Sequence, residues 1–281
     1  MALATTACLA AAGCGSGAHS GGAAAPSVGP RNVVLTAYDH TIAAGSARIT
    51  LRETVMTSGE AAAQGVTVTG SGVVDLSGRM GQFSFAVPQE GAVTMRIIGP
   101  ELYMELPPQL RNQVPGGKAW VSINLDKVAQ AKLGASLSQL SSSSQTLGQT
   151  LTYLRSVSDT GLVRVGVATV DGVATTEYGV TVDLTKAAAR ESAQAQAAVR
   201  KLEMQIHRTT LPMQVWIDHQ NRVRQVAYHL SVPAPAGGTD QIAVTEGISG
   251  FGAPVKISPP PAAEVDDITN QAVTAATSTT S

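Results

Sequence analysis

The sequence predicts an α+β fold, in which one long, curved, mostly antiparallel sheet takes its helices against a single face. Apolar and polar residues alternate in short runs about every ten to fifteen residues, with turn-forming Gly, Pro and Asp between them. The Asp171-Gly172 pair joins two such runs, which is typical of a two-residue hairpin turn. Helical spacing is confined to two regions, so the order of elements differs from repeated βαβ units.

The first half of the chain has the pattern of a strand meander. Ile49, Leu51 and Val55 alternate with polar residues, which is typical of a sheet with one covered and one solvated face. The predicted strands lie at residues 47–57, 66–76, 82–87, 93–98, 102–106 and 119–125. Gly70-Ser71-Gly72 falls inside the second of these runs and indicates a β-bulge.

Residues 163–184 give the clearest hairpin. A turn at Asp171-Gly172 pairs Val170 with Val173, and this register decides which side chains share a face. The predicted apolar face carries Val163, Val165, Val167, Thr169, Ala174, Thr176, Tyr178, Val180, Val182 and Leu184. A second hairpin at 213–230 has an apolar face of Met213, Val215, Ile217, Val226, Tyr228 and Leu230. A further strand is predicted at 242–248.

Apolar residues at helical spacing predict three helical stretches. The first carries Ala129, Leu133, Leu137 and Leu140, and the second carries Leu147, Leu151 and Leu154. The longest predicted helix, 185–207, carries Ala195, Val199, Leu202 and Ile206. Residues 251–261 are predicted to be extended, and residues 262–281, rich in Thr and Ser, to be a disordered tail.

The N-terminus has the features of an exported lipoprotein. Residues 1–13 are apolar and uncharged, and small residues precede Cys14, the expected site of diacylation. Two departures from this pattern are Ala11 at the third position before the cysteine and the lack of a basic residue before Arg31. An Ala-rich terminus with an incidental cysteine is the alternative. The predicted division is a signal peptide at 1–13, a flexible tether at 14–31, one domain at 32–261, and the tail at 262–281. The predicted location is the outer face of the cell membrane.

Composition and motifs argue against several classes of function. Charged residues make up 14% of the chain and its formal net charge is −1, so it lacks the basic surface that nucleic-acid binding needs. The sequence contains none of the common catalytic or phosphate-binding motifs, and its five histidines lack metal-ligand spacing. We therefore predict that the protein is not an enzyme and uses neither a cofactor nor a metal.

Five segments together resemble the actinobacterial LppX/LprA/LprF/LprG-like lipoprotein family, which has the LolA-like fold. They are LYMELPPQL (102–110), GKAWVSINL (117–125), VGVATVDGVATTEYGVTVDLTKAA (165–188), LPMQVWIDHQNRVRQVAYHL (211–230) and FGAPVKISPPPAAEV (251–265). The resemblance implies a half-barrel with helices on its concave face and a hydrophobic cavity between them. It also implies a role in binding, and transporting across the cell envelope, lipids or glycolipids with acyl chains. An envelope transporter is a further implied partner.

On this reading, one wall of the cavity comes from the two hairpins. The predicted lining is Val163, Val165, Val167, Tyr178, Val180, Val182, Met213, Val215, Ile217, Val226 and Tyr228. Periodicity alone fits a filled core equally well, and a non-carrier lipoprotein that acts as a protein-interaction or sensor module is the alternative function. Because a carrier with one opening needs no second subunit, a monomer is expected.

Overall fold

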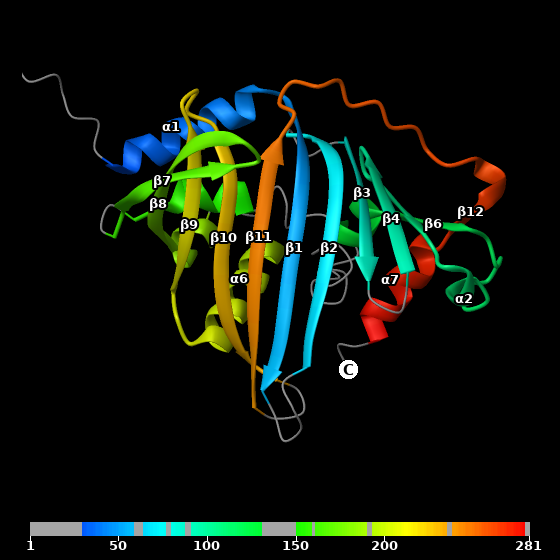
Figure 1. The fold of residues 1–281 in the computed structure, drawn as a ribbon. Coiled ribbons are helices and arrows are strands. Elements are labelled where there is room, and N and C mark those ends of the chain that lie inside the picture. Colours follow the sequence, from blue (N-terminus) through cyan, green and yellow to red (C-terminus); the bar gives the residue numbers. More distant parts are fainter. Residues whose placement is uncertain are drawn as a thin grey trace, which may run out of the picture.

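The computed structural model describes residues 30–58, 64–76, 80–87, 91–130, 150–158, 161–189, 193–234 and 238–278. Its strands form a twelve-stranded curved sheet in the order β12-β6-β5-β4-β3-β2-β1-β11-β10-β9-β8-β7 (Figure 1). Neighbouring strands are antiparallel, apart from the parallel pair of β12 with β6. The predicted α+β class with a large antiparallel sheet is confirmed.

Each predicted strand is present, with ends shifted by no more than three residues. The strands are β1 (Ser46–Ser58), β2 (Gln64–Asp75), β3 (Met80–Val87), β4 (Gly91–Ile98), β5 (Glu101–Glu105), β6 (Trp120–Asn124), β7 (Val163–Val170), β8 (Val173–Asp183), β9 (Thr210–Asp218), β10 (Val223–Pro233), β11 (Thr239–Ser249) and β12 (Val265–Asp267). The helices are α1 (Pro30–Ala43), α2 (Pro108–Arg111), α3 (Leu125–Gln130), α5 (Leu184–Ala188), α6 (Ala193–Ile206) and α7 (Thr269–Ser278). Short 3-10 helices are η1 (Leu154–Ser156), which continues a helical turn at 150–153, and η2 (Ala262–Glu264).

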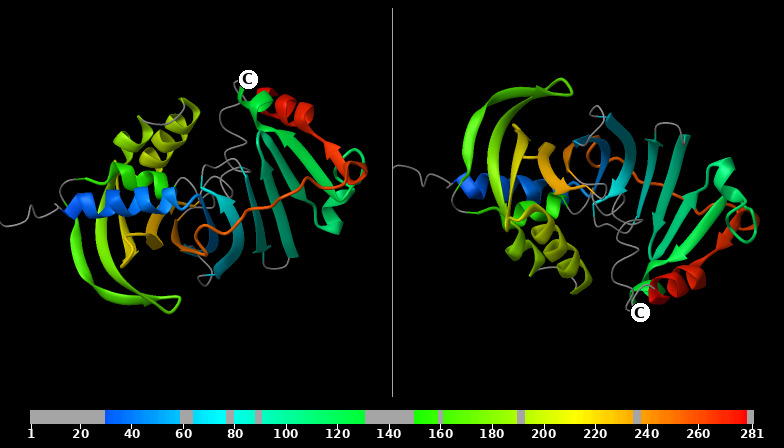
Figure 2. Two further views of the ribbon diagram at one scale, coloured as in Figure 1. Left: turned by 90° about the horizontal axis from the view of Figure 1, so that it is seen from above. Right: turned by 90° about the horizontal axis from the view of Figure 1, so that it is seen from below.

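The described helices pack against the sheet near its two ends. α1, α5, α6 and η1 contact strands β8–β10, whereas α3 and α7 contact β6. α6 lies on one face of the sheet, and the β7–β8 hairpin curls away from it toward the opposite face (Figure 2). We call the face that carries α5 and α6 the inner face, and the opposite one the outer face.

Strand pairing places one row of inner-face residues across eight strands. The row runs Tyr178, Val215, Val226, Glu246, Leu51, Gly70, Phe85 and Val93. Gly70 and Gly72 pair regularly with Phe85 and Phe83, so the predicted bulge is absent from this pair of strands. Instead, a Cβ on Gly70 would lie 2.7 Å from the Phe85 ring, so the glycines make room for the two aromatic rings.

α1 begins in the last two residues of the predicted tether and covers residues for which the sequence predicted no element. The helix begins at Pro30, a favoured first helical position, and its buried stripe is Val34, Ala37 and Thr41. The Thr41 hydroxyl donates to the Ala37 carbonyl at 2.7 Å and accepts from the Val223 backbone N–H at 2.8 Å. The helix is therefore joined to the start of β10.

The predicted disordered tail is wrong for most of its length. β12 pairs with β6, and Ile268, Ala272 and Val273 pack against Ile123 and Val128. At the start of α7, the Thr269 hydroxyl accepts from the Asn124 N–H, and Asp267 accepts from the Thr269 N–H, both at 2.9 Å. Residues 253–261 before it are extended, as predicted.

The predicted helix at 185–207 is divided in two, whereas the predicted leader and part of the predicted helical region cannot be compared with the structure. The single predicted helix 185–207 corresponds to α5 and α6, with a turn at Ala189. The signal peptide, Cys14 and the helical stripe from Leu133 to Leu147 lie outside the described residues. In the part of the chain that is described, no helix is both long and apolar enough to cross a membrane.

Candidate ligand-binding face

The inner face of strands β8–β10 is packed. Val182, Val215 and Val226 have no surface that water reaches, because they belong to a core with Leu151, Leu154 and the helices above them. The inward orientation predicted for this group is confirmed for the buried Val180, Val182, Met213, Val215, Ile217 and Val226, while Tyr178 and Tyr228 are half-buried. Their contact with a ligand stays a prediction.

The inward orientation predicted for Val163 and Val165 of β7 is wrong, and Val167 lies on the predicted face but is not covered. Val163, Val165 and Val167 are 61%, 59% and 73% exposed. The predicted pair of Val170 with Val173 is present, but a bulge at Val165 shifts the register, so Val163 lies opposite Gly179 rather than Val180. Val163 is thereby turned to the outer face, and Val167 keeps the predicted pairing but lies exposed on the outermost described strand of this side.

In the middle of the sheet the inner face carries buried residues, among them Leu51, Phe85 and Met95, and beside them a set of incompletely covered apolar residues. We call it the open apolar face; its members are Val55, Val66, Val68, Val74, Val93, Ile97, Met104 and Ile242. Val66 is about half exposed. Sequence reasoning assigned the lining to the two hairpins and missed these residues, although the alternation of residues 47–106 was the signal for them.

Acidic groups lie where the open apolar face meets the packed core. Glu246 is 1% exposed and accepts a hydrogen bond of 2.7 Å from the Thr150 hydroxyl. Burial raises the pKa of Glu246 to about 8, against the opposing effect of that hydrogen bond. Burial also raises the pKa of Glu53 and of Tyr228, and the nearby Glu246 and Glu53 raise that of Tyr228 further. A protonated Glu246 carries no charge, which suits its apolar surroundings.

A groove runs along β8–β10, and residues of both faces of the sheet line it. It has a volume of about 660 Å³, and Gly179, Gln214 and Ala227, which pair in register, contribute to its lining. Val163 and Arg208 also line it. Its size is within the range of small-molecule sites. Val180, Met213 and Tyr228, which the sequence predicted to line the cavity, are also part of its lining.

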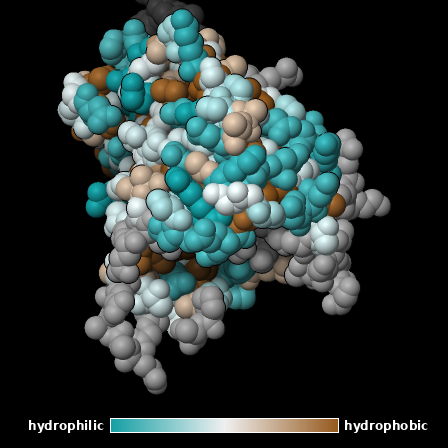
Figure 3. Space-filling view, turned by 90° about the vertical axis from the view of Figure 1, so that its right-hand side faces the viewer, coloured by the Kyte–Doolittle hydropathy of each residue, from teal (hydrophilic) through white to brown (hydrophobic). Residues whose placement is uncertain are grey.

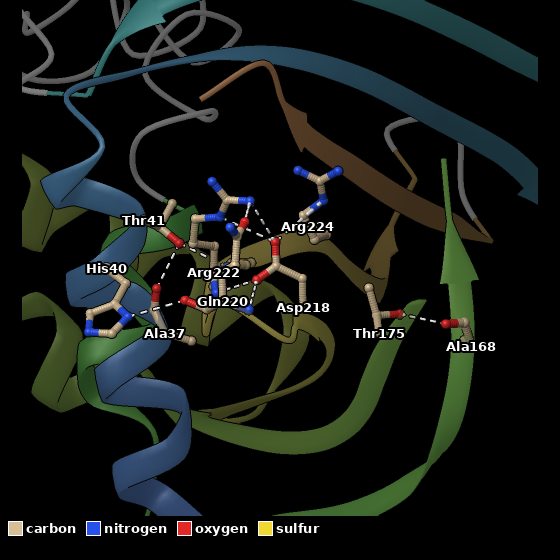
Figure 4. Close-up of polar contacts among 10 residues, drawn as sticks. Ala37, His40, Thr41, Ala168, Thr175, Asp218, Gln220, Arg222 and Arg224 are labelled. Atoms are coloured by element: carbon tan, nitrogen blue, oxygen red, sulfur yellow. Dashed lines mark hydrogen bonds and ion pairs between the residues drawn. The ribbon is translucent and has the colours of Figure 1, made fainter. Parts of the chain in front are cut away.

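A polar cluster at the β9–β10 turn has a structural role (Figure 4). The buried Asp218 accepts from the backbone N–H groups of Gln220 and Arg222, both at 2.9 Å, and from the Arg222 guanidinium at 3.1 and 3.2 Å. The Arg222 guanidinium in turn lies 4.4 Å from the centre of the Phe251 ring. Both side chains are thus fully engaged in holding the turn.

Other surfaces give little sign of chemistry. Within the described ranges, no three or more His, Cys, Asp and Glu side chains are grouped in a way that would hold a metal ion. Seen from the side of β6 and α7, the surface is mainly hydrophilic, with small, separate apolar areas (Figure 3).

Comparison with known proteins gave matches among solved structures. No protein-family model matches the sequence, and no curated protein matches it. The chain is similar to the lipoprotein LppX of Mycobacterium tuberculosis, with 15% identity, 82% of this chain and 98% of that chain covered, and a TM-score of 0.48. It is also similar to LprF from Mycobacterium bovis (14% identity, 84% and 99% covered, TM-score 0.43) and to a LolA superfamily protein of Nitrosomonas europaea (7%, 84% and 96%, 0.29). Because the TM-scores are below 0.5, the functional argument rests on the geometry of this chain.

Proposed function

We propose that this protein is a membrane-anchored lipoprotein that binds a lipid or glycolipid by its acyl chains and carries it across the cell envelope. The observation that carries the proposal is the open apolar face, where apolar side chains of β11, β1, β2, β4 and β5 remain partly exposed on the inner face of the sheet. Such a surface gains free energy when an apolar ligand covers it, about 25 cal/mol for each Å² removed from water.

The character of these side chains favours flexible acyl chains as the ligand. The open apolar face consists of Val, Ile and Met, and the aromatic rings between them, Phe83 and Phe85, are buried. The half-buried Glu53 at its border would accept hydrogen bonds from hydroxyl groups of a lipid head, as in a glycolipid. Acylation of Cys14 would hold the domain at the outer face of the cell membrane, where such ligands are available.

The experiment is lipid analysis of protein purified with its native leader from an actinobacterial host. Native mass spectrometry should detect a bound acyl lipid, and Val68→Lys should reduce its amount at least about tenfold, since a charge on the open apolar face opposes apolar burial. Thr69→Lys, on the outer face of the same strand, is the matched control and should keep the lipid. A lipid-free wild-type protein, or equal lipid content in both variants, would contradict the proposal.

A further inference from the structure

The β7 strand presents an unusual exposed apolar edge. Val163, Val165 and Val167 are exposed large hydrophobic side chains within five residues of one another. β7 ends the described order of strands, so one of its sides lacks a neighbouring described strand. Natural proteins usually protect such an edge with charged residues or prolines, because an exposed apolar edge promotes association. Here Arg164 is the charged residue among the three valines.

The bulge distributes these valines over both faces of the strand. Val163 pairs with Gly179 on the outer face, and a Cβ on Gly179 would lie 3.9 Å from Val165 Cγ2, so Val165 lies on that side too. Val167 pairs with Thr176 on the inner side. Because this edge is apolar on both faces, a lipid layer that surrounds it would cover it better than a flat protein surface that covers one side.

The N-terminal end of α1 lies beside the start of β7, as the views in Figures 1 and 2 agree. Cys14 lies sixteen residues before Pro30, in a Gly- and Ser-rich stretch of sequence. A chain of this composition and length reaches roughly 20–25 Å. Acylation at Cys14 would therefore keep the β7 edge within reach of the bilayer surface.

We propose that the β7 edge, residues Val163–Val167, inserts into the lipid interface of the membrane that Cys14 anchors. This inference rests on the proposed lipoprotein function. The two acyl chains expected at Cys14 already hold the chain at the membrane, so insertion of the β7 edge would fix how the domain lies against the bilayer. The long Arg164 side chain reaches the headgroups while the valines enter the apolar layer. The hairpin also carries two acidic residues. Glu177 is half-buried opposite Gly166, and Asp171 lies at the exposed hairpin turn, beyond the valines that would insert.

The first test measures which part of the lipidated full-length protein contacts lipid. Since Cys8 lies in the predicted signal peptide and Cys14 is acylated, a fluorophore attached at Val165→Cys would be the sole thiol label. In phosphatidylcholine vesicles that contain doxyl-labelled lipid, we expect its emission to fall at least about twofold. Labels at Met56→Cys and Leu110→Cys, two other exposed apolar positions, should keep their emission.

Three results would overturn the inference. Iodide in the water could quench the label at residue 165 equally with and without vesicles, which would leave the edge in solution. The label could be shielded without vesicles in a dimeric protein, which would assign the edge to a second copy. An intact mass without acyl groups on Cys14 would remove the anchor and with it the proposed function.

A second test separates membrane contact from ligand binding. The triple variant Val163→Thr, Val165→Thr and Val167→Thr keeps β-branched side chains, so the strand is retained. In the Cys14→Ser background, its vesicle partitioning should be about tenfold weaker than that of the parent. Its content of bound lipid should be unchanged. Equal partitioning of the triple variant and its parent would contradict the docking role, whatever the ligand content.

Discussion

Glu246 makes the stability of this protein depend on pH in an unusual direction. The pKa of its carboxyl is about 8 in the folded state and 4.5 without the protein environment. Between these values the folded protein holds a proton that the unfolded chain releases, so stability must fall as pH rises. Each pH unit in this window costs ~1.4 kcal/mol. The loss over the whole window is therefore at most about 5 kcal/mol.

The Glu246→Gln variant isolates this effect. The amide has nearly the same shape, and its oxygen accepts from the Thr150 hydroxyl as the carboxyl oxygen does at 2.7 Å. Because Gln is neutral at every pH, the variant should match the wild type near pH 4.5. At pH 7 its free energy of unfolding should exceed that of the wild type by about 3 kcal/mol. The reason is that the folded wild type must bind a proton at Glu246 that the unfolded chain has released.

Urea unfolding at closely spaced pH values between 4.5 and 8.5 measures these free energies. Other titrating groups affect both proteins alike, so the difference between wild type and variant reports Glu246. Glu264→Gln, at an exposed carboxyl, is the control and should leave the pH profile unchanged. Parallel profiles for wild type and Glu246→Gln would refute the argument that Glu246 is buried as a neutral acid.

Three other changes have expected outcomes that equilibrium unfolding would check. Asp218→Ala leaves the Arg222 guanidinium without its buried carboxylate and should cost about 3–5 kcal/mol; a loss below 1 kcal/mol would show that water replaces the pair. Gly72→Ala places a methyl against the Gln82 carbonyl oxygen and the Phe83 ring and should cost about 1–3 kcal/mol or more, whereas Gly166→Ala, with open space around it, should cost less. Truncation after Pro261 removes β12 and α7 and should destabilise the β6 end by several kcal/mol; an unchanged midpoint would support the tail that the sequence predicted.

Local alternation was sufficient to predict the strands, because a half-covered sheet needs apolar side chains at every second position. It was insufficient for α1, whose buried stripe of Val34, Ala37 and Thr41 is made of β-branched and small residues. It was also insufficient for α7, which is held by Asn124, 145 residues earlier in the chain. Contacts of this range leave little trace in local composition.

The sequence placed the candidate lining on strands β7–β10, whereas the site that we propose lies on the same face of β11, β1, β2, β4 and β5. Alternation shows which residues turn inward, but the parts of the inner face that helices cover depend on tertiary packing. One bulge at Val165 was enough to change the register of the outermost described strand, since side chains alternate with a period of two. Val165, the extra residue of the bulge, is exposed and lies in a run rich in Val and Gly. The sequence pattern therefore does not indicate that the register shifts there.

The attachment of α1 to the sheet has a mechanical consequence. A pull on the N-terminus would reach the fold through α1, whose Thr41 hydroxyl joins it to the backbone of Val223. The next element, β1, is paired along most of its length with both β2 and β11 in the middle of the sheet. Force along β1 would load many backbone hydrogen bonds in shear at once, which is the arrangement that resists extraction best. An anchor at Cys14, as proposed, would therefore pull on a strand that is paired on both of its sides.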